Sequence, residues 1–286
     1  MKQKYTTCVI MDPEMAVYKN SMRITVGDCT YGVSVIGDGE PIVCFHGFSE
    51  SGNTWDNVKL VNHAMYRIDC IGHGQSDKPR PLEPYTIPAM LEDMHTVINL
   101  AVGDKYALMG YSMGARLALL YALQYGDEVQ ALVLESGSVG IADETERQAR
   151  VDSDEALAQN IESLDSAWFA NMWANVSIFA SQQSLPDAVK AKIQARRQHN
   201  QVHALANTLR GSGQGIMPYV GDELHRLPCR TLYVSGSLDT KYDGIRQSVF
   251  EGQPNVTTHC IEGAGHNTHI EQPEEFSEVV LDFLRD

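Results

Sequence analysis

The segment 105–120, KYALMGYSMGARLALL, constrains the fold of this chain more than any other stretch. A short apolar run over Tyr106–Met109 predicts a buried strand. The sequence GYSMG follows directly at residues 110–114, and an Ala- and Leu-rich run after it predicts a buried helix. A strand, a G-x-S-x-G motif and a helix, in this order, are the context of a nucleophile elbow. The glycines permit the tight turn that exposes the serine hydroxyl.

Length and charge limit the classes of protein to consider. A chain of 286 residues is long enough for one large α/β domain with an insertion. Its net charge of −15 argues against a nucleic acid or an acidic membrane surface as a partner. No apolar run approaches the roughly 18 residues that a membrane span needs. The sequence favours no particular oligomeric state.

The cysteines indicate a reducing compartment. They are Cys8, Cys29, Cys44, Cys70, Cys229 and Cys260. They form no C-x-x-C motif, and most lie in or beside apolar runs, which is typical of reduced core cysteines in a cytoplasmic protein. The N-terminus, MKQKYTTCVIMDPEM, lacks the long apolar stretch of a signal peptide. We therefore expect a cytoplasmic protein.

Apolar runs that predict strands alternate with helical patterns along most of the chain. A hairpin is predicted over Met22–Val26 and Thr30–Ile36, separated by Gly27-Asp28. Further strands are predicted at Pro41–Phe45, Met65–Cys70, Val129–Glu135, Thr231–Ser235 and Val256–Ile261. Thr86 and Pro88 are expected to open a helix that runs through Val102, and Phe276–Leu284 to form the closing helix. The alternation predicts an α/β fold with a mostly parallel, doubly wound sheet.

Between about residue 140 and residue 227 the pattern changes to helices alone. The predicted helices are Glu144–Leu164, Ser166–Phe179, Leu185–Asn200 and Val202–Leu209. A helical stretch of this length between two strands predicts an inserted cap. We expect a core from residues 1–137 and 228–286 and an all-helical cap from residues 138–227.

Catalytic side chains are expected where predicted strands end, since chemistry gathers at the carboxyl ends of the strands in such sheets. Ser112 is the candidate nucleophile or base, Asp239 follows one later strand and His266 follows another. The order Ser, Asp, His is that of α/β-hydrolase triads. Asp239 would fix the tautomer of His266, although an Asp at this place can also be a helix N-cap.

Other residues compete for two of these roles. His269 is the alternative base, and Asp243 and Glu135 are the alternative acids. Backbone N–H groups of Phe48 and Met113 are placed to hold an oxyanion.

Metal and cofactor chemistry is not expected from the sequence. His46, just before the predicted oxyanion loop, is interpreted as a structural residue that holds loops by hydrogen bonds. No His, Cys or carboxylate grouping has the spacing of a metal site, so we expect neither a metal nor a cofactor.

Arg116 is unusual because it lies four residues after Ser112, on the same face of a core helix. A guanidinium there is costly unless it is paired or meets an anion. It is therefore either a buried ion-pair residue or a carboxylate clamp one turn from the serine. The arginines of the cap, taken singly, are interpreted as solvated charges, and Trp173 and Phe179 as packing between cap and core.

Several short motifs in both core and cap match one family. They are GYSMGAR at 110–116, ERxAR at 146–150, WxxxxxFAS at 173–181, LP at 185–186, RxxN at 197–200, LRGxG at 209–213 and AGHNxH at 264–269. With them the chain resembles the 2-succinyl-6-hydroxy-2,4-cyclohexadiene-1-carboxylate (SHCHC) synthases, menaquinone-pathway enzymes of the α/β-hydrolase fold. It departs from the family pattern at Ala115, where a second glycine is common, and in an N-terminal extension of roughly 15 residues.

The resemblance implies roles for particular residues. Ser112, Asp239 and His266 would form the triad. Substrate contacts would come from Tyr111, Arg116, Arg150, Trp173 and Arg197, with the adjacent Arg196 as the alternative to the last of these. The implied substrate, 2-succinyl-5-enolpyruvyl-6-hydroxy-3-cyclohexene-1-carboxylate, is a tricarboxylate that loses pyruvate. Either Ser112 or His266 would take a proton, without an acyl-enzyme.

Two other functions use the same sequence features. A carboxylesterase or a carbon–carbon bond hydrolase would use the triad covalently, but a neutral ester would not need Arg116 and Arg150. A catalytically silent receptor that binds a ligand under the cap would not need the intact triad.

Overall fold

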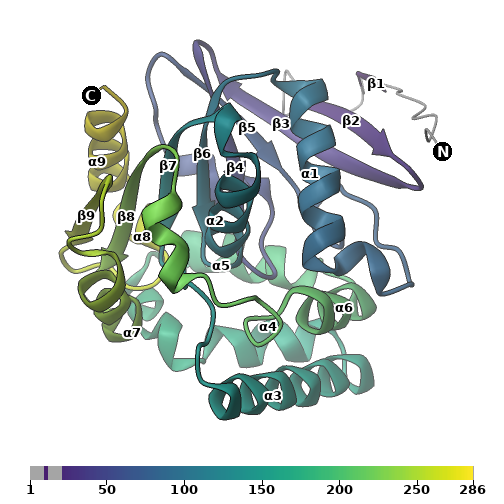
Figure 1. Ribbon diagram of the computed structural model, residues 1–286. Helices are drawn as coiled ribbons and strands as arrows, with labels where there is room; N and C mark the ends of the chain where they lie inside the picture. The colour runs from purple at the N-terminus through teal and green to yellow at the C-terminus, as the bar shows by residue number, and fades with distance from the viewer. Residues whose placement is uncertain (1–9, 12–20, 286) are drawn as a thin grey trace.

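One mixed sheet runs through the part of the chain that the computed structural model describes, residues 10–11 and 21–285 (Figure 1). Its described strands lie in the order β1-β2-β3-β5-β4-β6-β7-β8-β9. They are β1 (Ile10–Met11), β2 (Ser21–Val26), β3 (Cys29–Gly37), β4 (Glu40–Phe45), β5 (His63–Ile68), β6 (Tyr106–Tyr111), β7 (Val129–Glu135), β8 (Arg230–Gly236) and β9 (Val256–Ile261). The pairing is parallel from β5 to β9, and β1, β2 and β3 add an antiparallel edge.

Helices cover both faces of the sheet and one end of it. The α-helices are α1 (Ile87–Ala101), α2 (Met113–Tyr125), α3 (Glu144–Ser163), α4 (Ser166–Ala174), α5 (Asp187–Gln198), α6 (Val202–Ser212), α7 (Thr240–Ile245), α8 (Thr268–Glu271) and α9 (Pro273–Arg285). Short 3₁₀ turns include η1 (Gly52–Asn57), η2 (Glu83–Tyr85), η4 (Ser177–Ser184) and η5 (Gly221–Arg226), and a π turn, η6 (Arg246–Phe250), extends α7. The doubly wound sheet predicted from the sequence is confirmed.

The central strands are apolar on both faces because both faces are covered. On β4, Val43 and Phe45 point to the core that α1 and α2 close, whereas Ile42 and Cys44 point to the core that contains Trp55 and α9. All four side chains are buried. This alternation fixes the register of the strands, since a slip by one residue would exchange the two cores.

The antiparallel edge agrees with the predicted hairpin. Strands β2 and β3 pair up to Val26 and Cys29, and Gly27 in the turn has a φ of +56°. A φ in this range is accessible to glycine without steric cost.

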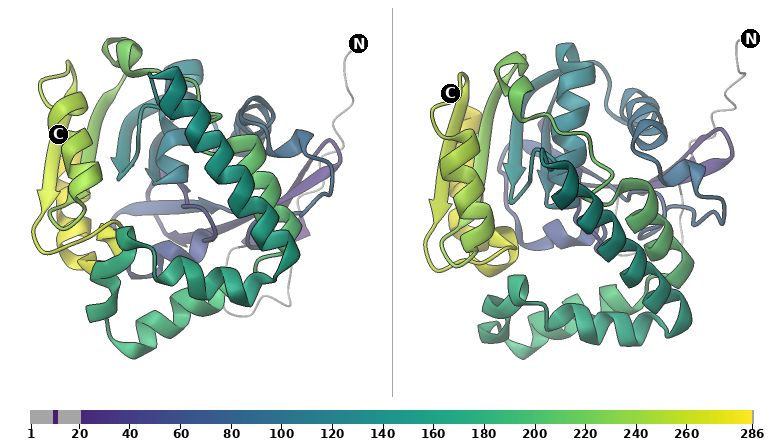
Figure 2. Two further views of the ribbon diagram at one scale, coloured as in Figure 1. Left: turned by 90° about the horizontal axis from the view of Figure 1, so that it is seen from below. Right: turned by 60° about the horizontal axis from the view of Figure 1, so that its bottom comes forward.

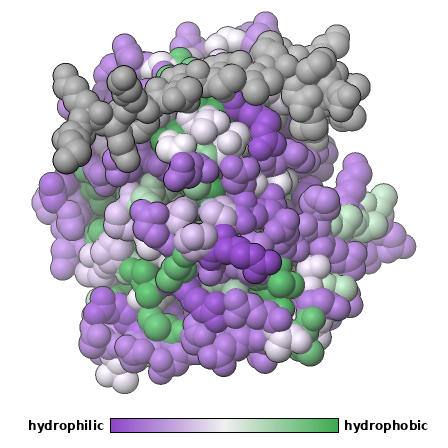
Figure 3. All heavy atoms as spheres, turned by 90° about the vertical axis from the view of Figure 1, so that its right-hand side faces the viewer, coloured by the Kyte–Doolittle hydropathy of each residue, from purple (hydrophilic) through white to green (hydrophobic). Residues whose placement is uncertain are grey.

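Figure 3 shows a face of the molecule where hydrophilic side chains predominate and hydrophobic ones form small separate groups.

Several elements differ from the bounds predicted for them. Strand β5 ends at Ile68 rather than at Cys70, because the N–H of Cys70 donates to His46 Nε2 (3.0 Å) and not to a neighbouring strand. The helix predicted over Ser166–Phe179 stops at Ala174, and η4 continues the chain. Thr86 precedes α1 as predicted, but its hydroxyl donates to the carbonyl of Glu83 rather than capping the helix.

The segment between β7 and β8 is helical, with α3, α4, α5 and α6 gathered across one end of the sheet (Figure 2). These helices have their own hydrophobic cluster, in which Ile161, Phe169 and Leu205 are fully buried. Phe48, from the loop after β4, packs against this cluster. The helical segment therefore packs against the loop after β4, at one end of the sheet.

The described cysteines are free, and four of them are buried: Cys29, Cys44, Cys70 and Cys229. Cys260 is half-buried. Cys8 and most of the N-terminal extension lie outside the described residues. Among the helices described, none combines the length and apolar character that a membrane crossing requires.

Candidate active site

Ser112 stands at a strained turn between β6 and α2. Its φ and ψ are 52° and −107°, a conformation that non-glycine residues rarely adopt and that is typical of a functional site. The turn is closed by glycines on each side. A Cβ at Gly110 would lie 2.3 Å from the carbonyl oxygen of Gly114, and one at Gly114 would lie 2.3 Å from that of Phe45. The two glycines of GYSMG are thus required by the closeness of the backbone.

The structure brings Ser112, Asp239 and His266 together. His266 Nε2 lies 2.9 Å from Ser112 Oγ, and His266 Nδ1 lies 2.6 Å from Asp239 Oδ2. Asp239 and His266 are buried. A carboxylate on Nδ1 holds the proton there, so Nε2 is free to accept the serine proton. Asp239 also takes the N-cap position of α7, where Oδ1 accepts the N–H of Tyr242 (3.3 Å). The same residue therefore contacts His266 and caps a helix.

The alternative triad residues are engaged elsewhere. His269 Nδ1 lies 2.6 Å from Glu135 Oε2, so two of the competing candidates pair with each other. Asp243 accepts hydrogen bonds from Ser235 and Arg246. Neither arrangement includes the hydroxyl of Ser112.

A cavity of about 310 Å³ opens over Ser112 between the core and the helical segment. Its lining includes Phe48, Glu50, Tyr111, Met113, Arg116, Arg150, Trp173, Phe179, Gln214, Lys241 and His266. Aromatic rings form one wall, with Trp173 placed 5.5 Å from Phe48 and 6.0 Å from Phe179 between ring centroids. The cavity is large enough for a small ring compound with short substituents.

Arg116 lines this cavity without a carboxylate partner. Its Nη1 donates to the main-chain carbonyl of Ser212 (3.0 Å), and within the described residues no carboxylate forms an ion pair with it. Burial lowers its pKa to about 10, with the Arg150 cation adding to the effect. A guanidinium in this state is an incomplete pair, because only an anion can offset its lost hydration.

Arg150 and Lys241 bring further positive charge to the same cavity. Arg150, on α3, is held by Asp154 Oδ1 (2.9 Å) and by Gln214 Oε1 (2.6 Å). Much of Lys241 is exposed, but desolvation of its ammonium and the charge of Arg150 lower its pKa. Three cations therefore converge on one cavity of a protein with a net charge of −15.

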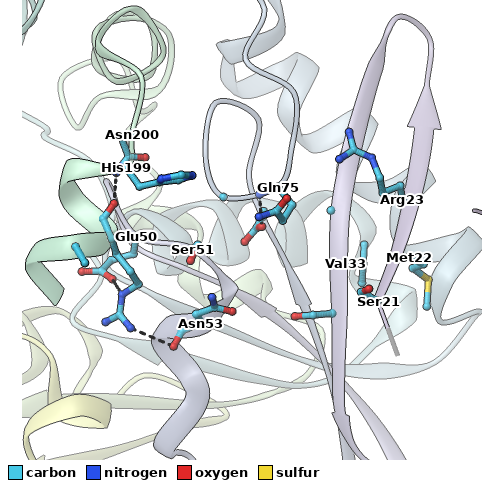
Figure 4. Close-up of a pocket in the computed structure, with 16 residues that line it drawn as sticks. Ser21, Met22, Arg23, Val33, Glu50, Ser51, Asn53, Gln75, His199 and Asn200 are labelled. Carbon is cyan, nitrogen blue, oxygen red and sulfur yellow. Dashed lines mark hydrogen bonds and ion pairs between the residues drawn. The ribbon is translucent and has the colours of Figure 1, made fainter. Parts of the chain in front are cut away.

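Glu50 is the acidic residue in the lining, and Arg196 neutralises it. Arg196 Nε lies 2.9 Å from Glu50 Oε2, and the Glu50 side chain is almost fully buried. Figure 4 shows Glu50 in a second cavity, of about 360 Å³, between α5, the loop at Gln75 and the β2–β3 hairpin. The Glu50–Arg196 pair therefore stands between the two cavities.

Arg197 lies outside the lining of the catalytic cavity. It is 2% exposed, its guanidinium carbon is 4.6 Å from the centroid of the Phe179 ring, and its Nε has no hydrogen-bond partner among the residues that the structure describes. Phe179 does line the cavity. A direct contact between Arg197 and the substrate stays a prediction, and in this structure the residue supports an aromatic wall.

Backbone groups near Ser112 fit the predicted oxyanion hole. Met113 is the first residue of α2, so its N–H has no acceptor within the helix, and both Met113 and Phe48 line the cavity. His46 is buried, and its Nε2 accepts the N–H of Cys70 (3.0 Å), which fits a structural role. Among the described residues, no group of three His, Cys, Asp or Glu side chains has a metal-binding arrangement.

Sequence reasoning missed Lys241, Gln214 and Glu50. Lys241 comes two residues after Asp239, at the start of α7, and this closeness to a triad residue was the available signal. Gln214 and Glu50 had none, because their places in the lining depend on how the helical segment packs on the core.

Comparison with known proteins agrees with this geometry. Residues 40–273 match a family model described as alpha/beta hydrolase fold. A protein of Bacillus subtilis (strain 168), provisionally named 2-succinyl-6-hydroxy-2,4-cyclohexadiene-1-carboxylate synthase, is 34% identical over 269 residues, covering 92% of this chain and 98% of the relative. A protein of that name from Enterobacter sp. (strain 638) is 28% identical over 251 residues, covering 85% and 91%.

A solved structure supports the same relationship. MenH from S. aureus matches with a TM-score of 0.84 and 28% identity, covering 88% of this chain and 97% of that one. An esterase from Thermogutta terrifontis, 22% identical with a TM-score of 0.81 over 93% of this chain and 98% of that one, shares the fold. Because the family model spans most of the chain and a relative is over 30% identical along nearly its whole length, this chain belongs to the SHCHC synthase family within the α/β-hydrolase superfamily.

Proposed function

We propose that this protein is a carbon–oxygen lyase of menaquinone biosynthesis. It converts 2-succinyl-5-enolpyruvyl-6-hydroxy-3-cyclohexene-1-carboxylate into SHCHC and pyruvate. The names of its relatives support the reaction, and the cavity supports the substrate. The observation that carries the proposal is the partly buried guanidinium of Arg116 beside the triad, which has a carbonyl for a partner but no carboxylate among the described residues.

The reaction needs a base and a site for negative charge. A base removes the proton from C2 of the ring, which is acidic because C2 bears the succinyl ketone. The electron pair forms the C2=C3 bond, the C3=C4 bond moves to C4=C5, and the C5–O bond breaks. Enolpyruvate leaves and takes a proton on its methylene carbon to become pyruvate. Substrate atoms equal product atoms, so neither water nor a cofactor is consumed.

The triad supplies the base in this proposal. Ser112 Oγ and His266 Nε2 share a hydrogen bond of 2.9 Å, and Asp239 stabilises the imidazolium that forms when His266 receives a proton. The N–H groups of Phe48 and Met113 would hold the enolate oxygen of the succinyl ketone. No bond to Ser112 is needed.

The cations supply substrate recognition. The substrate has three carboxylates, and Arg116, Arg150 and Lys241 line the cavity. A charge-assisted hydrogen bond from a guanidinium fork is well suited to a carboxylate. Tyr111 and Trp173 would contact the ring, since both line the same cavity. The gathered positive charge would also attract the anion to an acidic protein.

Measurement of pyruvate tests the proposal. Wild type, Ser112→Ala and Arg116→Ala are assayed with the enolpyruvyl substrate in a lactate-dehydrogenase-coupled reaction. We expect turnover by wild type, none by Ser112→Ala, and a loss of about 10- to 150-fold in kcat/KM for Arg116→Ala, which is roughly 1.5–3 kcal/mol. Arg147→Ala is the control for removal of an arginine outside the cavity lining, because Arg147 lies on α3 and pairs with the exposed Glu144.

One alternative reaction uses the same atoms. A serine 2.9 Å from a histidine can also attack a carbonyl, as in an esterase or a carbon–carbon bond hydrolase. Rapid hydrolysis of p-nitrophenyl esters without release of pyruvate from the enolpyruvyl substrate would establish that alternative.

The cytoplasmic location belongs to the proposal, supported by the free cysteines.

A further inference from the structure

A second carboxylate–imidazole pair lies next to the triad and is fully buried. Glu135 and His269 are each 0% exposed. His269 Nδ1 lies 2.6 Å from Glu135 Oε2, and its Nε2 lies 2.7 Å from the hydroxyl of Thr54. The imidazole is enclosed by rings, with Trp55 at 4.4 Å and Tyr111 at 4.9 Å between centroids. This pair contacts neither the cavity nor Ser112 Oγ, so the proposed reaction gives it no direct role.

Glu135 is bonded to both sides of the triad. Its main-chain carbonyl accepts the N–H of Ser112 (2.8 Å), which holds the elbow. Its carboxylate accepts the Thr268 hydroxyl (2.6 Å) and the N–H of His269 (3.0 Å), which hold the loop after His266. One residue at the end of β7 therefore ties the serine and the histidine to a common point.

From this geometry we propose that Glu135 and His269 are positioning residues that set the distance between Ser112 and His266. The triad needs this hydrogen bond for any reaction in which His266 activates the serine. The proposal adds to the proposed function, on which it rests for its pyruvate measurement alone.

The loop that carries His266 has a small number of other attachments. Within it, Glu271 accepts the N–H groups of Gly265 and Asn267, so those bonds shape the loop but do not place it. Asn267 Oδ1 accepts hydrogen bonds from Tyr111 and from Gln182, which lies in η4 of the helical segment. Tyr111 at the end of β6 and Glu135 at the end of β7 therefore both attach the loop to the sheet, and His269 extends the Glu135 attachment to Thr54.

Three donors converge on the Glu135 carboxylate, and this makes Glu135→Gln an informative change. The amide replaces one acceptor oxygen with an NH₂ group. At least one of the Thr268 hydroxyl, the His269 N–H and the imidazole Nδ1–H then loses its acceptor. The loop moves to relieve this contact, and a displacement on the order of 1 Å at catalytic groups can cost about 100-fold in rate.

The test measures the reactivity of Ser112 without the substrate. Wild type and Glu135→Gln are treated with a fluorophosphonate, which bonds to the serine oxygen and releases fluoride, and the rate of labelling is followed by mass spectrometry. We expect labelling at least about 10-fold slower in Glu135→Gln, and pyruvate release with a lower kcat but a KM within about twofold of wild type.

Two further variants separate positioning from loss of stability. Asp93→Asn removes another partly buried carboxylate, which lies on α1 outside the lining of the catalytic cavity and accepts the hydroxyl of Tyr31 (2.6 Å). It should lower Tm but leave labelling unchanged. Thr54→Val, which removes the hydroxyl on His269 Nε2, should slow labelling in the same direction but by less, and it serves where Glu135→Gln does not fold.

The outcomes are distinguishable. Labelling of folded Glu135→Gln and Thr54→Val at the wild-type rate, measured well below Tm, would overturn the positioning role. Slow labelling in these variants but not in Asp93→Asn supports it. If wild type is labelled but releases no pyruvate, the proposed function fails while the labelling comparison still decides the positioning role.

Discussion

The guanidinium of Arg116 donates to the carbonyl of Ser212, 3.0 Å away, and so joins the helix that begins at the nucleophile to the last residue of α6. A carbonyl satisfies one N–H but does not neutralise the charge. The remaining donors are available to a carboxylate in the cavity, and the bond to Ser212 orients the planar group before the ligand arrives. Preorganisation of this kind reduces the entropy lost on binding.

This arrangement predicts that Arg116→Lys is a poor replacement. Lysine keeps the charge, but it cannot bond to Ser212 and present a two-pronged face to a carboxylate at once. We expect kcat/KM for pyruvate release between those of wild type and Arg116→Ala, with the loss mainly in KM. Steady-state kinetics of the three proteins give the comparison. A wild-type KM in Arg116→Lys would show that charge alone is recognised.

Lys241→Met should raise KM by about 5- to 30-fold, as expected for a lost charged contact of about 1–2 kcal/mol at a partly exposed site. The pH dependence has a definite sign. The pKa of Lys241 is lowered by desolvation and by Arg150, so its cation is lost as pH rises, at a lower pH than for an ordinary lysine. Wild-type KM should therefore increase on the alkaline side, and the variant should lack this first increase.

Lys190→Met is the control for Lys241→Met. Lys190 lies on α5 and pairs with the exposed Asp187. Its KM should stay within twofold of wild type at every pH. An equal rise in KM for both lysine variants would indicate a general charge effect and contradict the local contact.

Arg196→Met should weaken substrate binding although Arg196 is absent from the lining of the catalytic cavity. It leaves the buried Glu50 carboxylate without its partner, and that carboxylate lines the cavity that receives the anion. We expect a higher KM and a lower Tm. In the double variant with Glu50→Gln, KM should return toward wild type, and the four proteins form a double-mutant cycle. Additive effects on KM would contradict the coupling.

The sequence predicted the parts of this site that depend on local pattern. Strand ends could be located from apolar runs and turn residues, and Ser112, Asp239 and His266 each follow such an end. The GYSMG motif could also be interpreted from local sequence, because the clash that excludes a side chain at Gly110 lies within the turn itself. The family motifs added arginines of the helical segment to the list of predicted substrate contacts.

The roles of other residues depend on tertiary packing, which the sequence pattern does not predict. Arg196 and Arg197 are adjacent on α5 and so point in different directions, one to Glu50 and the other to Phe179. Residue type and spacing do not rank them, and only the family motif favoured Arg197 over Arg196 as a substrate contact. Glu135 and His269 were competing triad candidates because residue type and strand-end position suit both. Only the tertiary structure, which pairs them with each other across 134 positions, shows that they satisfy a different requirement.

The buried His73 predicts how stability depends on pH. Burial lowers its pKa to about 3, with an added contribution from His46, whose ring centroid is 5.1 Å away and whose pKa burial also lowers. Unfolded, the side chain titrates near 6.5. Between pH 6.5 and 3 the unfolded state thus binds more protons, so the free energy of unfolding falls as pH decreases, by up to about 1.4 kcal/mol per pH unit for this group. The contribution is fully present above pH 6.5.

Urea unfolding between pH 5 and 7.5 measures this slope. His73→Gln should lower stability at pH 7.5, because His73 Nε2 accepts the N–H of Ser49 (3.3 Å), but it should reduce the loss of stability on acidification. His199→Gln changes an exposed histidine and should leave the slope unchanged. A slope in His73→Gln equal to that of wild type would mean that other groups cause the acid sensitivity. His46 would be the next to replace, since its Nε2 accepts the N–H of Cys70 in the same buried cluster.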